Sequence, residues 1–248
     1  MEVQTVFAFL RSGTVRPMEG RRAQLRAELM GKIKAAGLKE LRRTGAASLS
    51  LREVAKTAGI SPSGMYRYVD GRDGLLELLI SDGFEAFGLA IEEAIEKADN
   101  DVLSRLEAIA FTYRRWAQAN PDRFGLILGT PVPGFHARAD GPTVSSVYRF
   151  SEPMVRVVAA AYGAGDLVGL GVDVARDAKV ALDPTTFLPE SLNEILARGW
   201  SRIHGLVSLE LYGHLAWGDV NVERLLRAEM RSIMDELSNA SPANVNRK

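Results

Sequence analysis

The chain has 248 residues, 46% of them hydrophobic, which is enough for one large or two ordinary domains with packed cores. It contains no cysteine, which excludes disulfide bonds, thiolate metal ligands and a cysteine nucleophile. Its 31 basic and 31 acidic residues cancel, but residues 1–75 carry 14 Lys and Arg against 7 Asp and Glu, and the remainder carries 17 against 24. This imbalance predicts that the basic N-terminal third binds phosphate groups and that the acidic remainder does not.

The apolar runs are all well short of the roughly 18 residues that cross a bilayer. Residues 3–10 are mildly apolar, but they lack the basic start and the small-residue cleavage site of a signal peptide. We therefore expect a soluble, cytoplasmic protein without a membrane partner. Met18 is an alternative translation start, in which case residues 1–17 would not belong to the native protein.

The first predicted helix spans residues 22–43, after a basic, flexible tail over residues 1–21. The helix carries an inner stripe of apolar residues, namely Leu25, Leu29, Ile33, Ala36 and Leu41. Five arginines lie on or before it, namely Arg11, Arg16, Arg21, Arg22 and Arg26. Two interpretations of these arginines remain open, because they either reach flanking phosphates or a minor groove, or form a solvated surface.

Residues 51–68 predict two short helices joined by a turn that contains glycine. Ser50 and Glu53 have the spacing of a capping box at the start of the first helix. Apolar residues then recur at helical spacing, and Gly59 ends the helix in a left-handed conformation. Such a pair of helices is suited to placing the second one in the major groove of DNA.

The second helix begins with Ser61 as its N-cap and Pro62 at its first position. It runs for only about seven residues before Asp70 and Gly71, so tertiary packing must hold it. Its predicted buried side carries Met65 and Val69. The predicted exposed side carries Ser63, Gly64, Tyr66, Arg67 and Tyr68.

The segment 50–76 (SLREVAKTAGISPSGMYRYVDGRDGLL) resembles the DNA-binding domain of TetR-type transcriptional regulators, and the resemblance extends over residues 22–76. It implies a three-helix helix-turn-helix domain over residues 22–71 that binds double-stranded DNA. Gly64 departs from the family, whose members commonly have a small or hydroxyl residue there that can touch a base. The alternative is a helical hairpin with no role in DNA binding, but a hairpin has no need to expose Tyr66, Arg67 and Tyr68.

The predicted DNA-binding residues are Ser50, Arg52, Ser61, Ser63, Gly64, Tyr66, Arg67, Tyr68 and Arg72. Arg52 resembles the family position that reaches a base edge, and Arg67 is expected to bind guanine through two hydrogen bonds. Tyr66 and Arg72 are expected to contact phosphates, and Tyr68 is compatible with either role. Ser50 and Ser61 place helix N-termini where phosphate binding is favourable.

The rest of the chain predicts only helices, so we expect an all-α fold with a larger C-terminal effector-binding and dimerisation domain over residues 72–238 and a flexible tail over 239–248. The predicted helices span residues 72–98, 102–119, 121–128, 142–162, 189–212 and 220–238. The first carries an inner stripe of Leu76, Leu79, Phe84, Phe87, Ile91 and Ile95. Residues 129–142 and 163–189 are predicted loops, the second with a short helix near 173–181 and the length of a lid or binding loop.

Trp200, His204 and Gly205 look like the Trp-His-Gly signature of one TetR C-terminal subfamily, in a match over residues 190–237. The resemblance implies that the last two helices pair with those of a second copy in a homodimer. The predicted dimer interface comprises Gly199, Trp200, Ile203, Leu206, Leu226, Met230, Ile233 and Leu237. The alternative is that these residues form a core within one chain.

The resemblance also implies a small-molecule effector, with a pocket between the helix over 72–98 and the C-terminal core. The predicted wall residues are Phe111, Tyr113, Trp116, Phe124, Phe135, Tyr148 and Phe150. Arg114, Arg115 and His136 either orient an anionic effector or form solvated surface. We found no catalytic constellation, metal-ligand spacing or cofactor motif, so we expect no enzyme, no metal and no cofactor.

The predicted function is therefore sequence-specific DNA binding by a dimeric transcriptional repressor, which a small-molecule effector releases from a palindromic operator. The alternative is an architectural or activating DNA-binding protein without ligand sensing. The sequence does not identify the operator, the effector or the regulated genes.

Overall fold

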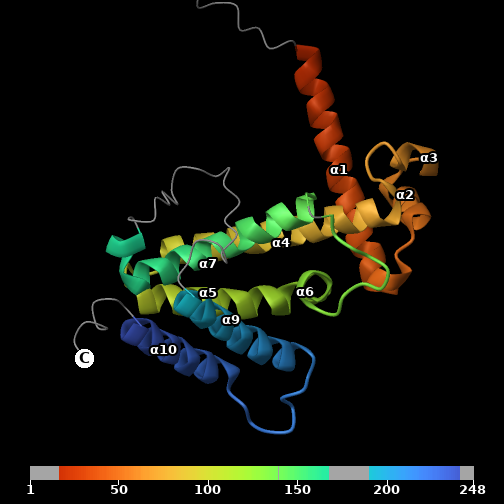
Figure 1. Cartoon of the computed structure of the whole chain (residues 1–248). Coiled ribbons are helices and arrows are strands. Elements are labelled where there is room, and N and C mark those ends of the chain that lie inside the picture. The colour runs from red at the N-terminus through yellow and green to blue at the C-terminus, as the bar shows by residue number, and fades with distance from the viewer. Residues whose placement is uncertain (1–16, 139, 168–189, 241–248) are drawn as a thin grey trace, which may run out of the picture. The chain divides into compact units, whose positions relative to one another are not determined.

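A computed structural model describes residues 17–138, 140–167 and 190–240 of the chain. Within these ranges every regular element is a helix and none is a strand, which confirms the predicted all-α fold (Figure 1). The chain divides into two compact units, residues 1–76 and 77–248. Helix α4, Gly71–Lys97, is continuous through this division and contributes its residues 71–76 to the first unit.

The first unit contains α1 (Pro17–Thr44), the short 3₁₀ turn η1 (Ala46–Ser48), α2 (Leu51–Ala58) and α3 (Pro62–Met65). Helix α2 packs against both α1 and α3. Their buried side chains form a small core that comprises Ile33, Ala36, Leu41, Leu49, Val54, Ala55, Met65, Val69, Leu75 and Leu76. A three-helix core of this kind holds α3, which is too short to be stable alone.

Helix α1 differs from its prediction at its start. It begins at Pro17, five residues before the predicted Arg22, so residues 17–21 are helical. Leu25 was predicted to face inward but is 56% exposed, and Leu29 is only half-buried. The apolar stripe is therefore buried only in the second half of α1, where Ile33, Ala36 and Leu41 meet the rest of the unit.

The second unit contains the remainder of α4 with α5 (Val102–Ala119), α6 (Pro121–Leu128), α7 (Pro142–Leu167), α9 (Glu190–Leu211) and α10 (Val222–Ala240). Helix α10 packs against α9, α5 and α7, and Figure 1 shows α9 and α10 side by side. Helices α5 and α6 have the predicted bounds, whereas α7 continues to Leu167, beyond the predicted residue 162. The predicted short helix near 173–181 lies outside the described residues.

Local chemistry explains where the central helices begin. The Asp101 carboxylate accepts a hydrogen bond from the Ser104 backbone N–H at 2.9 Å, which caps α5. Hydrogen bonds from the Ser104 side chain first, and from its backbone N–H second, lower the pKa of Asp101. Pro121 begins α6 directly after Asn120, whose N–H donates to the Trp116 carbonyl at 2.9 Å. On α4, the predicted inner residues Leu79, Phe84, Phe87 and Ile91 are buried, and Ile95 is half-buried.

Candidate DNA-binding surface and C-terminal core

The start of α2 is capped as predicted, but by a different pair of side chains. The Ser50 hydroxyl accepts a hydrogen bond from the Glu53 backbone N–H at 3.4 Å. The backbone N–H of Ser50 donates to the carboxylate of Glu40 on α1, the role that the predicted capping box gave to Glu53. Arg43 first, and Ser50 to a smaller extent, hold the pKa of Glu40 below its usual value. The cap therefore also fastens α2 to α1.

The turn between α2 and α3 has the predicted geometry. Gly59 ends α2 with a φ of 74°, a left-handed conformation that glycine adopts without steric cost. The Ser61 hydroxyl accepts a hydrogen bond from the Gly64 backbone N–H at 3.0 Å, and Pro62 is the first helical residue. A Cβ atom at position 64 would lie 3.0 Å from the Ser61 oxygen. Gly64 therefore fits closely under the cap that starts α3.

The exposed side of α3 carries most of the predicted DNA-binding residues. The α-helix ends at Met65, so Tyr66, Arg67 and Tyr68 follow in a turn, not in the seven-residue helix that we predicted. Met65 is fully buried and Val69 is 5% exposed, so the opposite side of this segment faces the solvent. Ser63 and Arg67 are exposed and Tyr66 is 64% exposed, whereas Gly64 and Tyr68 are half-buried. Arg52 is also exposed, near the start of α2.

Arg72 makes contacts within its own unit that the sequence did not predict. One terminal nitrogen of its guanidinium donates to the carbonyl oxygens of Ala46 at 3.0 Å and Ala47 at 3.2 Å. Another forms an ion pair with Asp73 at 3.4 Å. The guanidinium therefore joins the start of α4 to η1 within its own unit, and its predicted phosphate contact stays a prediction.

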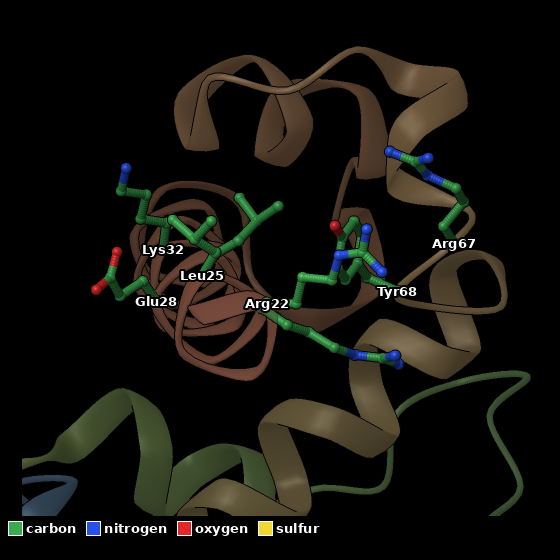
Figure 2. A pocket seen from close by; sticks show the side chains of 8 residues that line it. Arg22, Leu25, Glu28, Lys32, Arg67 and Tyr68 are labelled. Atoms are coloured by element: carbon green, nitrogen blue, oxygen red, sulfur yellow. The ribbon is translucent and has the colours of Figure 1, made fainter. Parts of the chain in front are cut away.

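A groove beside the turn after α3 was not predicted as a site. The groove lies between α1 and the turn after α3 (Figure 2), and its volume is about 550 Å³. Its lining residues are Arg22, Leu25, Arg26, Glu28, Leu29, Lys32, Arg67 and Tyr68. Four of these are cations and one is an anion, so the groove favours a negatively charged occupant. One sign of this groove was present in the sequence, namely the arginines near the start of α1. For these arginines both interpretations, phosphate binding and solvated surface, remained open.

The residues predicted to line an effector pocket divide into two groups. Tyr113, Trp116, Phe124 and Phe150 are buried, whereas Phe111, Phe135 and Tyr148 are half-buried. Three of the buried rings pack around Phe87 of α4, which stacks on Trp116 with ring centroids 4.1 Å apart, and Phe124 contacts the ring of Tyr113. Phe87 also contacts the rings of Tyr113 and Phe150, at 4.9 and 5.0 Å. The sequence placed Phe87 on an inner stripe but did not identify it as the centre of this aromatic cluster.

A polar contact lies at the edge of the aromatic cluster. The Tyr113 hydroxyl lies 2.9 Å from Nδ1 of His204, and Nε2 of the same ring lies 3.3 Å from the Ser208 hydroxyl. Burial raises the pKa of Tyr113 and lowers the pKa of His204, so both groups are held neutral. Trp200 stacks on His204 with ring centroids 5.3 Å apart, as their four-residue spacing predicted.

The polar residues considered for an anionic effector are engaged or exposed. Arg114 donates two hydrogen bonds to the Glu210 carboxylate, at 2.7 and 2.6 Å, and is therefore paired within the unit. Arg115 and His136 are exposed, and Arg115 donates to the Thr112 hydroxyl at 2.9 Å. In the described part of the chain no group of three or more His, Asp or Glu side chains is placed to hold a metal ion. None of the described helices is long and apolar enough to cross a membrane.

Two protein-family models match the chain, one over the DNA-binding region and one over the C-terminal region. Residues 33–79 match the family model described as bacterial regulatory proteins, tetR family, and residues 106–233 match that of the tetracyclin repressor-like C-terminal domain. The HTH-type transcriptional regulator Rv1816 of Mycobacterium tuberculosis is 32% identical over 210 residues, which are 78% of this chain and 85% of that protein. The chain belongs to the TetR family of transcriptional regulators.

Solved structures share the fold of this chain. The crystal structure of the regulatory protein SCO4313 has a TM-score of 0.65 and 31% identity, with 88% of this chain and 99% of that chain covered. A protein from Rhodococcus sp. RHA1 has a TM-score of 0.64 at 24% identity, covering 85% and 95%. TetR-family proteins regulate transcription by binding DNA, so this chain is a DNA-binding regulator and not an enzyme.

The predicted dimer interface of this TetR-family protein needs a correction. Five of its eight residues are buried within the single chain, namely Ile203, Leu226, Met230, Ile233 and Leu237. Gly199 belongs with them, because a Cβ atom there would lie 3.1 Å from Ile233. A side chain that its own helices cover has no surface left for a second chain. Of the predicted set, Trp200 is 46% exposed and Leu206 is half-buried.

Proposed function

We propose that this protein is a homodimeric repressor that binds a palindromic operator and leaves it when a small molecule binds the C-terminal unit. The observation that carries the DNA-binding part is the exposed set of Arg52 on α2 and of Tyr66 and Arg67 in the turn after α3, in a basic unit where both helices are capped. Residues 22–71 would form the DNA-binding domain and residues 72–238 the sensing and dimerisation domain. Repression follows from steric exclusion at a promoter, which needs no contact with the polymerase.

The proposed base-reading residues are Arg52 and Arg67, with Tyr68 at the edge. Both arginines are exposed, and a guanidinium can donate two hydrogen bonds to guanine. Ser50 and Ser61 start the two helices, and Ser63, Gly64 and Tyr66 complete the surface that would face the DNA. Gly64 contributes a close backbone approach, because it has no side chain to present to a base.

We assign the flanking phosphate contacts to α1 in place of Arg72. Arg22 and Arg26 line the groove that also contains Arg67 and Tyr68, so this groove adjoins the proposed base-reading side chains (Figure 2). Phosphate contacts from such cations position a protein on DNA without reading its sequence. This supports the phosphate-binding interpretation of the arginines near the start of α1.

The homodimer would form through the outward side of α9 and α10. On α9, Ser201, Gly205 and Ser208 form a stripe of small residues, and a Cβ atom at Gly205 would meet nothing within 4 Å. On α10, Ala228 is exposed and Leu225 is half-buried. Small residues at helical spacing allow a second pair of helices to approach closely. An isologous dimer would present two α3 helices to the two halves of a palindrome.

Footprinting of the purified protein on the DNA upstream of its own coding sequence tests the proposal. We expect two protected half-sites about one helical turn of DNA apart, or a multiple of it, related by a two-fold axis. Addition of the effector should abolish the protection. Protection of a single half-site would contradict the dimer, and no protection at any concentration would contradict operator binding.

A further inference from the structure

Two buried hydroxyl groups lack a partner in the second unit. Ser81 on α4 and Thr143 on α7 are each 8% exposed. Among the described residues, neither Ser81 Oγ nor Thr143 Oγ1 has a hydrogen-bonding partner. Native proteins satisfy nearly all buried polar atoms, because an unsatisfied one loses its hydrogen bonds to water without replacement. A pair of such atoms therefore indicates a place where a further polar group binds.

The register of α4 and α7 brings these hydroxyl groups to the same level. The two helices lie side by side and run in the same direction (Figure 1). Ion pairs join Glu85 to Arg149 at 2.6 Å and Glu92 to Arg156 at 2.9 Å, and both pairs span 64 residues.

Gly88 lies against the Phe150 backbone, where a Cβ atom would be 3.2 Å from the Phe150 Cα. Ser81 precedes Gly88 by seven residues, and Thr143 precedes Phe150 by the same number. Seven residues are about two helical turns, so the two hydroxyl groups are expected to face the same line of contact between α4 and α7, which we call the seam.

The surroundings of this seam are apolar on one side. Phe84 lies one turn after Ser81 on α4, and its ring centroid is 5.4 Å from that of Phe150. Phe150 also contacts Phe87, so the aromatic cluster begins directly beyond the two hydroxyl groups. A ligand at this seam would therefore have its polar atom at Ser81 and Thr143 and its apolar body against aromatic rings.

The charged groups beside the seam are already paired. The Glu77 carboxylate, one turn before Ser81, accepts hydrogen bonds from Arg138 at two distances of 3.2 Å. The guanidinium of Arg123 is bound to Asp82, the residue after Ser81, while its Nε is a further buried donor without a partner among the described residues. A charged ligand would bring a buried charge without a counter-ion, which is unfavourable. An uncharged oxygen can accept from these donors without that penalty.

We propose that Ser81 and Thr143 bind the polar end of the effector, and that the effector is an uncharged aromatic or alicyclic molecule with one carbonyl or hydroxyl oxygen. This inference rests on the proposed function, in which the C-terminal unit senses a small molecule.

Acetophenone and ethylbenzene test the proposal, because they have a similar shape and only the ketone has an oxygen. Dissociation constants are measured by ligand-observed NMR for the wild-type chain and for Ser81→Ala, Thr143→Val and the double variant. The wild type should bind acetophenone about tenfold more tightly than ethylbenzene, as one additional hydrogen bond predicts. Each single variant should reduce this ratio, and the double variant should abolish it. Because both changes remove hydroxyl groups without a partner, the melting temperature of the free variants should not fall.

Ser151→Ala is the matched control, since its hydroxyl donates to the Tyr148 carbonyl on the same helix, at 3.1 Å. It should keep the wild-type preference for the ketone. Equal affinity for the two compounds, binding of neither, or an unchanged ratio in the double variant would overturn the assignment. Operator binding is measured separately on the same variants. If they keep operator binding and no ketone preference exists, only this inference fails; if the ketone preference holds without operator binding, only the proposed function fails.

Discussion

The guanidinium of Arg72 binds the carbonyl oxygen of Ala46 at 3.0 Å, across 26 residues of sequence. Hydrogen bonds to charged groups contribute about 1.5–3 kcal/mol to stability. We predict that Arg72→Ala lowers the free energy of unfolding by about 1–3 kcal/mol in a urea titration, because two carbonyl oxygens of η1 lose their donor. Arg231→Ala, at an exposed position on α10, should leave it unchanged. Unchanged stability of Arg72→Ala together with weaker binding to all DNA would restore the phosphate-binding role.

The salt dependence of DNA binding tests the role given to α1. Arg22→Ala combined with Arg26→Ala should weaken binding to every duplex alike. It should also reduce the slope of log affinity against log salt by about 2 per DNA-binding unit, because each phosphate contact contributes roughly 0.9. Glu28→Gln is the matched control, since it changes a carboxylate that lines the same groove. An unchanged slope in the double variant would leave these arginines as solvated surface.

The outward stripe of α9 makes a prediction about oligomeric state. Gly205→Trp should produce a monomer by sedimentation equilibrium, because a large side chain prevents close approach of a second α9. The chain itself should fold normally, since a Cβ atom at Gly205 meets nothing within 4 Å. Gly31→Trp is the control, because Gly31 is an exposed helical glycine with equally free space on α1. A dimer of undiminished affinity in Gly205→Trp would place the interface elsewhere.

The buried His204 ring predicts a pH dependence of stability. Burial lowers its pKa in the folded chain below the ordinary value of 6.5, so the unfolded chain binds the proton first as the pH falls. The contribution of His204 to the free energy of unfolding should therefore be constant above about pH 6.5. It should decrease as the pH falls from 6.5 through the lower pKa of the folded chain. The decrease should be smaller in His204→Gln, measured by chemical denaturation across that range. An identical pH profile for both proteins would contradict the burial of His204.

The sequence predicted what depends on neighbours along the chain. The caps at Ser50 and Ser61, the left-handed Gly59 and the bounds of α5 and α6 follow from local hydrogen bonding and helix-starting residues. It could not predict contacts that tertiary structure creates, such as Glu40 with the Ser50 backbone. A stripe of apolar residues at helical spacing also shows that a face is covered, but not by which chain. This explains why Met230 and Leu237, fully buried within their own chain, were assigned to a dimer interface.

The pairing of Ser81 with Thr143 illustrates the same limit for the effector site. Nothing in the spacing of residues 62 apart in sequence marks them as neighbours. Only the register of α4 and α7, indicated by the Gly88 approach and the arginine ion pairs, places the two residues at the same level along the helices. The sequence therefore predicted a pocket from aromatic residues alone and named neither of these hydroxyl groups, and both sets remain proposals for an effector site.

Equilibrium binding measures whether Arg67 recognises the operator sequence. Fluorescence anisotropy would compare the footprinted operator with a scrambled duplex of equal length and composition, for the wild type and Arg67→Ala. The wild type should prefer the operator by at least about 10³-fold. Arg67→Ala should lose about 1–3 kcal/mol on the operator and relax the preference at one base pair in each half-site. Equal affinity of the wild type for both duplexes, or an equal loss on both in Arg67→Ala, would show that Arg67 does not read the operator sequence.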